Sequence, residues 1–272
     1  MQSAAPELAQ IKSAMKASWM AGDFGQIAKY SAKIGEEFIA RTAIKPGTRV
    51  LDVACGTGNT AIPAAKAGAV VTGLDLVPSL LEQARQRAAA EKLNIVFQEG
   101  DAEELPFKDR EFDLVITMFG AMFAPRPERV AAELVRVCGS GEKIAMANWT
   151  PEGFVGKQFR AMSEIVPPPP GIPAPILWGD EKVVRQRLSK GISNLVTTRQ
   201  KGYLDFPFAP NQVVAFFRQY FGPTQVAFSK LDAAGQAQLA LRLESLWTEH
   251  NLSKNGNTRV EAEYLDVRAT VV

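Results

Sequence analysis

Residues 49–148 alternate short apolar runs with helical patterns, and this alternation constrains the fold more than any other feature of the chain. Apolar runs separated by helical segments are typical of βαβ units, whose parallel strands form a sheet covered on both faces. With 272 residues the chain is long enough for such a layered domain. We therefore expect a doubly wound α/β fold. Strands are expected at 49–54, 70–74, 94–98, 112–118 and 143–148, and helices at 60–67, 78–92 and 127–138.

The segments on either side of this region have different patterns. Residues 7–43 are helical in pattern with an interruption at 21–23, and the prolines between 167 and 175 predict an extended connector. Further helices are expected at 180–190, 210–220 and 231–251, and strand composition returns at 194–206 and 258–272.

Composition excludes several classes of protein. The chain has 46% apolar and 22% charged residues and a net charge of +2, so it lacks the broad basic field of many nucleic-acid binders. No apolar run approaches the roughly 20 residues that span a bilayer, and the amino terminus shows no secretory signal. Cys55, Cys138 and the single histidine argue against a disulfide framework or a metal site. We expect a cytoplasmic protein without metal, nucleic-acid partner or membrane span.

The segment VLDVACGTGNTA, residues 50–61, predicts a glycine-rich turn between a strand and a helix. Its G-x-G-x-x-A form satisfies the dinucleotide fingerprint. Gly56 and Gly58 allow a ligand to approach the backbone, and the free N–H groups of the following helix attract an anionic group. A pyrophosphate and an amino-acid carboxylate suit this loop equally well. The loop therefore predicts a nucleotide-type ligand without identifying it.

Two acids follow the next two strands at the same edge of the expected sheet. Asp75 closes the second strand, where a carboxylate accepts hydrogen bonds from ribose hydroxyls. Asp101 follows the third strand and is placed to meet an adenine amino group.

The order and spacing of five segments resemble those of class I S-adenosylmethionine-dependent methyltransferases. The segments are LDVACGTGNT, GLDL, GDAEELPF, FDLVITMFG and AELVRVC, within residues 45–150. The resemblance is to the small-molecule branch of the methyltransferase domain 11 type, which includes ubiquinone and menaquinone C-methyltransferases. NWTPEGF, after the fifth strand, resembles an uncharacterised bacterial subfamily of this group. The resemblance implies a Rossmann-like, seven-stranded, mostly parallel sheet with a reversed last strand. It also implies in-line methyl transfer from S-adenosylmethionine to a small, partly apolar acceptor.

The resemblance also implies where the cofactor binds. The glycine loop would hold its methionine end, Asp75 its ribose, and Asp101 with Ala102 its adenine. Ala54 stands where many members have glycine, and we expect only a slight effect because alanine permits an ordinary strand conformation. The cofactor-binding residues expected are Asp52, Ala54, Cys55, Gly56, Gly58, Asn59, Asp75, Leu76, Asp101, Ala102, Thr117 and Met118.

Candidates for acceptor binding and catalysis rest on weaker signals. Methionine and aromatic residues after the fourth strand and in the flanking segments are typical of an apolar pocket, although each suits ordinary core packing equally well. The acceptor-pocket candidates are Trp19, Phe119, Met122, Phe123, Trp149 and Trp178. Tyr30, Tyr220 and His250 are weak catalytic candidates, and a histidine at the end of a helix is also explained by the helix dipole.

The resemblance divides the chain into four parts, and two other functions stay open. We expect an amino-terminal helical lid at 1–45, a cofactor-binding core at 46–150, an acceptor cap at 151–192, and completion of the sheet at 193–272. An NAD(P)-dependent oxidoreductase also fits the loop and Asp75, and a regulatory nucleotide-binding module without chemistry is a third interpretation. The sequence leaves monomer and homodimer open.

Overall fold

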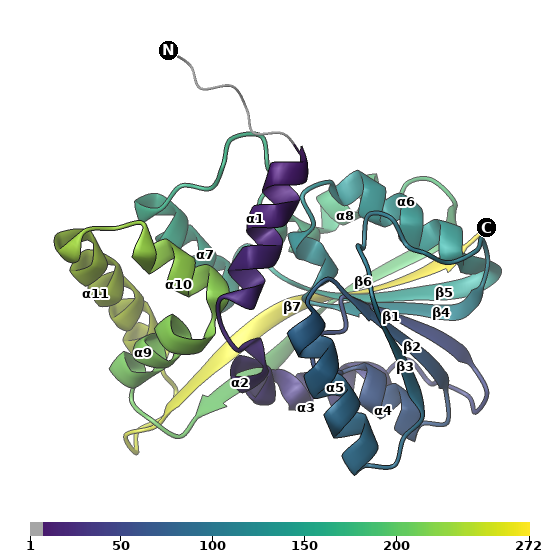
Figure 1. Cartoon of the computed structure of the whole chain (residues 1–272), viewed down its shortest axis with the longest axis horizontal. Coiled ribbons are helices and arrows are strands. Elements are labelled where there is room, and N and C mark those ends of the chain that lie inside the picture. Colours follow the sequence, from purple (N-terminus) through teal and green to yellow (C-terminus); the bar gives the residue numbers. More distant parts are fainter. Residues whose placement is uncertain (1–7) are drawn as a thin grey trace.

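A seven-stranded sheet runs through the computed structural model, which describes residues 8–272 (Figure 1). The order of its strands is β3-β2-β1-β4-β5-β7-β6. Strands β1 to β5 are parallel, whereas β7 runs antiparallel to both β5 and β6. The expected doubly wound sheet with one reversed strand is confirmed. The strands are β1 Arg49–Val53, β2 Val70–Asp75, β3 Ile95–Glu99, β4 Phe112–Met118, β5 Cys138–Trp149, β6 Ile192–Phe206 and β7 Thr258–Val271.

Helices cover both faces of this sheet, as the alternating pattern predicts (Figure 1). Helices α3, α4 and α5 lie on one face, and α6 and α8 lie on the other. Apolar β1 is buried from Val50 to Val53, which is typical of a central parallel strand. These helices are α3 Ala32–Ala40, α4 Ala61–Lys66, α5 Pro78–Ala90, α6 Pro127–Val137 and α8 Glu181–Arg187.

A second group of helices packs at one end of the sheet, where the long strands β6 and β7 extend beyond the others (Figure 1). This group combines helices from three separate parts of the chain, so the residues beyond 192 do more than complete the sheet. Its members are α1 Leu8–Met20, α2 Phe24–Ala28, α7 Phe154–Ile165, α9 Pro210–Tyr220, α10 Gly222–Ser229 and α11 Ala233–Glu249.

Two of these helices, α7 and α10, were not expected from the sequence. Helix α10 begins with Gly222-Pro223, which reads as a turn, but proline in the first turn of a helix costs no hydrogen bond. Helix α7 carries Gly156 in its first turn, which weakens the helical pattern. A Cβ on Gly156 would lie 2.3 Å from the Thr150 carbonyl oxygen, so close packing requires this glycine.

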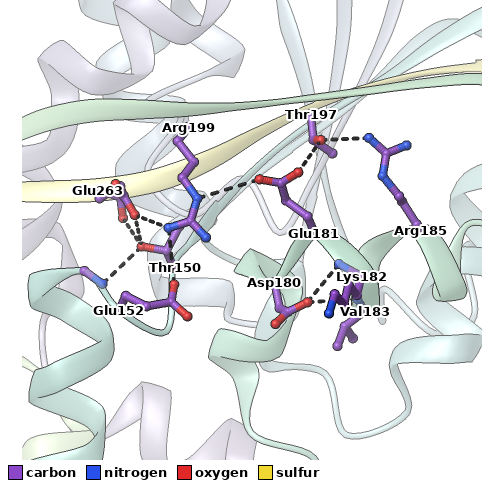
Figure 2. Close-up of polar contacts among 11 residues, drawn as sticks. Thr150, Glu152, Asp180, Glu181, Lys182, Val183, Arg185, Thr197, Arg199 and Glu263 are labelled. Carbon is purple, nitrogen blue, oxygen red and sulfur yellow. Dashed lines mark hydrogen bonds and ion pairs between the residues drawn. The ribbon is translucent and has the colours of Figure 1, made fainter.

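A polar cluster centred on Arg199 of β6 fixes the segments that precede α7 and α8 (Figure 2). Its Nη1 donates to Glu263 Oε1 of β7 at 2.9 Å and to Glu152 Oε2 at 3.3 Å. Thr150 Oγ1 also donates to Glu263 Oε1, at 2.9 Å, and Arg199 Nε lies 3.7 Å from Glu181 Oε1 in α8. The starts of both helices are thereby tied to the β6–β7 pair.

Candidate functional site

The topology of the sheet places a cavity at the carboxyl ends of its central strands. The strand order reverses on either side of β1, and in open α/β sheets such a switch point is where ligands bind. A cavity with an empty volume of about 940 Å³ lies there, which we call the loop cavity. It is lined by the glycine loop, by residues that follow β2, β3 and β4, and by α1 and α2.

Most of the expected cofactor-binding residues line the loop cavity. These are Ala54, Cys55, Gly56, Asn59, Asp75, Leu76, Asp101, Ala102 and Met118. Asp52, Gly58 and Thr117 are buried or turned away and are not part of the lining. Gly58 has φ +85°, a conformation that favours glycine, so this glycine serves the turn itself. A Cβ on Gly56 would meet nothing within 4 Å, so the Gly56 backbone is open to a ligand.

The backbone of the site is strained at two residues that carry side chains. Ala54 has φ +56° and Phe119 has φ +61°, a left-handed conformation that costs roughly 1–2 kcal/mol for an L-residue. The expectation that Ala54 would keep an ordinary strand conformation was therefore wrong. The turn into the loop needs a positive φ whatever residue stands there. Both strained residues line the loop cavity.

Asp75 connects the glycine loop to the end of β2. Its Oδ2 accepts from the Gly56 N–H at 2.8 Å, and its Oδ1 accepts from the Val77 N–H at 2.9 Å. Burial raises the pKa of Asp75, although these backbone hydrogen bonds lower it. The carboxylate both fixes the loop and presents acceptor oxygens to the cavity.

Asp52 supports the same loop from a fully buried position on β1. Its Oδ2 accepts from Thr60 Oγ1 at 2.6 Å, while its Oδ1 has no hydrogen-bond partner among residues 8–272. Burial raises the pKa of Asp52 to about 7, and the nearby Asp75 carboxylate adds to that rise. Asp52 therefore acts on the loop through Thr60.

Hydrogen bonds hold the glycine loop between α5 and the amino-terminal helices. Arg87 of α5 donates from Nη1 to the Thr57 carbonyl at 2.6 Å and to Asn59 Oδ1 at 2.9 Å. Asn59 Nδ2 in turn donates to the Ala28 carbonyl at 2.8 Å. The loop and the wall formed by α2 are thus parts of one network.

Helix α1 forms another wall of the loop cavity, through Met15 and Trp19. Lys12 Nζ lies 2.5 Å from Asp101 Oδ2 and 2.5 Å from Glu103 Oε2. The other oxygen of Asp101 accepts from the Glu103 N–H at 2.9 Å. Asp101 therefore joins the wall formed by α1 to the end of β3.

A second cavity, with an empty volume of about 680 Å³, adjoins the first. Five residues line both cavities: Trp19, Phe24, Ser31, Phe119 and Phe123. We call this second cavity the aromatic chamber. The rest of its lining is Ile27, Tyr30, Trp149, Val155, Gln158, Phe159, Leu204, Phe206, Phe217 and Phe221, so no Asp, Glu, Lys, Arg or His of residues 8–272 lines it.

The structure separates the candidates for acceptor binding and catalysis into two groups. Trp19, Phe119 and Phe123 line both cavities, and Trp149 and Tyr30 line the aromatic chamber. The other candidates lie outside both linings. Met122 is buried in the core, and Tyr220 packs on Phe216. The indole of Trp178 lies 4.7 Å from the Arg187 guanidinium. His250 follows the last residue of α11, and its Nε2 lies 3.0 Å from Lys157 Nζ.

Several lining residues were missed because they come from helices that the sequence did not reveal. Gln158 and Phe159 lie on α7, and Phe221 directly precedes α10. The buried positions Phe154, Gln158, Ala161 and Met162 have helical spacing. This spacing is the sequence signal from which α7 could have been predicted.

Comparisons with known proteins agree with this geometry. A family model described as "Methyltransferase domain" matches residues 50–141. An uncharacterised protein of Mycobacterium tuberculosis is 40% identical over 257 residues, which cover 92% of this chain and 91% of that protein. A demethylmenaquinone methyltransferase of Deinococcus radiodurans is 40% identical over 124 residues, or 44% of this chain and 52% of the relative. A putative methyltransferase structure from Bacillus halodurans shares the fold, with a TM-score of 0.58 and 18% identity over 87% of this chain and 97% of that one.

Proposed function

The chain belongs to the class I S-adenosylmethionine-dependent methyltransferases, and from this premise we propose that it methylates an uncharged, largely apolar small molecule bound in the aromatic chamber. The observation that carries the proposal is that the two cavities adjoin and share Trp19, Phe24, Phe119 and Phe123 in their linings. One cavity has the polar groups that suit the cofactor. The other has an apolar wall for the acceptor.

The residues of the loop cavity fit S-adenosylmethionine. The open backbone at Gly56 suits the methionine end, the buried carboxylate of Asp75 suits the ribose hydroxyls, and Asp101 with Ala102 suits the adenine. When bound, this cofactor supplies a methyl group on a positively charged sulfur that is already activated for displacement. The chain therefore needs no covalent nucleophile to activate the methyl group.

The task left to the protein is alignment and exclusion of water. Trp19, Phe119 and Phe123 stand where the two cavities meet, so they orient an acceptor toward the loop cavity and keep the junction apolar. The one titratable side chain in the chamber is Tyr30, among the residues that the structure describes. An acceptor whose nucleophile is reactive without a strong base suits this chamber.

The oxidoreductase alternative receives no support from the family model or from the relatives and the structure described above. No helix within residues 8–272 has the length and apolar character to cross a membrane. A cytoplasmic location, the absence of a nucleic-acid or metal partner, and a monomeric or homodimeric state remain proposals from composition.

Calorimetry with S-adenosylhomocysteine tests the proposed function. We expect binding by the native protein, and binding at least about tenfold weaker by Asp75→Ala, which loses the loop contact and the ribose acceptor. Asp109→Ala is the matched control, because its carboxylate is 76% exposed and, among residues 8–272, pairs only with Arg136. Absence of heat with folded native protein would overturn the proposal, and heat with NADH instead would favour the oxidoreductase.

A further inference from the structure

We infer that Gln158 of α7 determines acceptor specificity: its side-chain amide binds a hydroxyl or carbonyl group on an uncharged acceptor. This inference rests on the proposed function and deepens it. It starts from a polar side chain in a chamber whose wall is otherwise almost entirely apolar. Seven phenylalanines and two tryptophans line that chamber.

The side chain of Gln158 lines the aromatic chamber without a hydrogen-bond partner in the described part of the chain. The residue is 8% exposed, lines the aromatic chamber, and forms no side-chain hydrogen bond with any other residue between 8 and 272. A carboxamide offers two donors and one acceptor oxygen. A ligand group that completes these hydrogen bonds therefore gains affinity that an apolar ligand does not.

The position of Gln158 is fixed by the packing of α7. Phe154, one turn earlier, packs its ring on Trp247 with centroids 4.5 Å apart. Phe159 lies beside Phe123, where the two cavities meet, with centroids 5.7 Å apart. The charged residues Lys157 and Arg160 of the same helix are exposed. Gln158 is thus the one polar side chain that α7 presents to the chamber.

Other polar groups of the chamber do not satisfy this amide. Ser31 Oγ is engaged, since it donates to the Ala28 carbonyl at 3.1 Å and accepts from Asn59 Nδ2 at 3.4 Å. Tyr30 lies with its ring against Phe206, centroids 4.3 Å apart, and forms no side-chain hydrogen bond to Gln158. Neither side chain therefore occupies the Gln158 amide, whose donors and acceptor are available to a ligand in the chamber.

The same lining indicates the class of acceptor. Because no charged side chain of residues 8–272 lines the chamber, an ionised acceptor would lose its hydration without gaining a counter-ion. Aromatic walls favour flat rings, which pack on them edge to face or offset. An uncharged, flat molecule with one hydroxyl or carbonyl group satisfies both the wall and Gln158.

Three probes that share one ring system test this inference. Calorimetry in the presence of S-adenosylhomocysteine would measure 2-naphthol, naphthalene and 2-naphthoate on the native protein, Gln158→Leu and Gln158→Met. The control is Gln186→Leu, a change at an exposed glutamine of α8 outside the chamber. We expect the native protein and the control to bind 2-naphthol about tenfold more tightly than naphthalene, and to bind 2-naphthoate most weakly.

In both Gln158 variants we expect the preference for 2-naphthol over naphthalene to fall to about one, with naphthalene bound as well as before. A merely structural role would weaken both probes together and leave their ratio unchanged. An unchanged ratio, no preference in the native protein, or no binding of either neutral probe would each overturn the inference. If S-adenosylhomocysteine still binds in the same samples, a negative result with the naphthalene probes contradicts the inference about Gln158 and not the proposed function.

Discussion

The ring of Phe119 lies flat on the indole of Trp149, with centroids 3.6 Å apart and planes 8° apart. The strained backbone of Phe119 is held in place by its N–H, which donates to the Ala147 carbonyl of β5 at 2.9 Å. Tyr264 of β7 meets the Phe119 ring edge to face, with centroids 5.6 Å apart. The junction of the two cavities is therefore built by stacking across β4, β5 and β7.

A double-mutant cycle measures this stack. We expect Phe119→Leu and Trp149→Leu each to lower the free energy of unfolding, and their effects to be coupled by about 0.5–1.5 kcal/mol because each variant removes the same stack. Urea unfolding of the two single variants and the double variant gives this number. Additive effects would show that the two rings pack independently.

Ala54→Gly should stabilise the protein by about 0.5–1 kcal/mol, because glycine adopts φ +56° without strain. The matched control is Ala89→Gly in the exposed face of α5, which should destabilise by a similar amount because helical glycine loses more chain entropy. Thermal and urea unfolding would measure both. A loss of stability in Ala54→Gly would mean that the packing of its methyl group outweighs the strain.

Lys12→Met should speed the release of S-adenosylhomocysteine, with affinity weaker by about three- to tenfold. The change removes both ion pairs that hold α1 to Asp101 and Glu103, so the wall that carries Met15 and Trp19 loosens. Lys33→Met is the control, since that lysine is 85% exposed. Salt screens these ion pairs, so the release rate of the native protein, measured by stopped flow, should approach that of the variant as the salt concentration rises. Slower release from Lys12→Met would instead mean that Lys12 competes with the ligand for Asp101.

The stability contribution of Asp52 should depend on pH. Its pKa of about 7 in the folded protein exceeds the ordinary 3.8, so the folded state keeps a proton that the unfolded chain has released. This contribution is fully present below about pH 4 and is lost as the pH rises through 7. Asp52→Asn cannot titrate and still accepts a hydrogen bond from Thr60.

The stability of Asp52→Asn relative to the native protein should therefore rise by about 1–3 kcal/mol between pH 5 and 7.5. Asp75, whose pKa is also raised, remains in both proteins and largely cancels in the comparison. Urea unfolding at the two pH values measures the difference. Parallel pH profiles of the two proteins would contradict the assignment.

The sheet was predictable because its signals are local. The strand Phe112–Met118 is a largely apolar run, and the structure places it at the expected residues. By contrast, β5 begins at Cys138, five residues before the expected start at 143, because its first half is polar and lacks that signal. The glycine loop and Asp75 were predictable for the same reason, since strand ends in a parallel sheet meet at one edge. Each of these elements can be predicted from residues that are adjacent in the sequence.

The aromatic chamber was less predictable because it is assembled from distant segments. Tyr30 and Phe206 are in contact because β6 extends beyond the other parallel strands and reaches the amino-terminal helices. No local sequence pattern predicts that these two residues meet. The conformation of Ala54 was misjudged since its φ depends on the course of the chain on both sides. Trp178 looked like a pocket residue but packs against Arg187, because composition alone does not give the direction of a side chain.

The position of β7 has a consequence for biosynthesis. It follows β6 in the chain but lies between β5 and β6 in the sheet, so β6 is synthesised before the strand with which it pairs in residues 8–272. Tyr264, which packs on the Phe119 ring, arrives on the same late strand. An unpaired strand edge readily pairs with other chains. The edge of β6 is therefore unpaired until residues 258–271 have been synthesised.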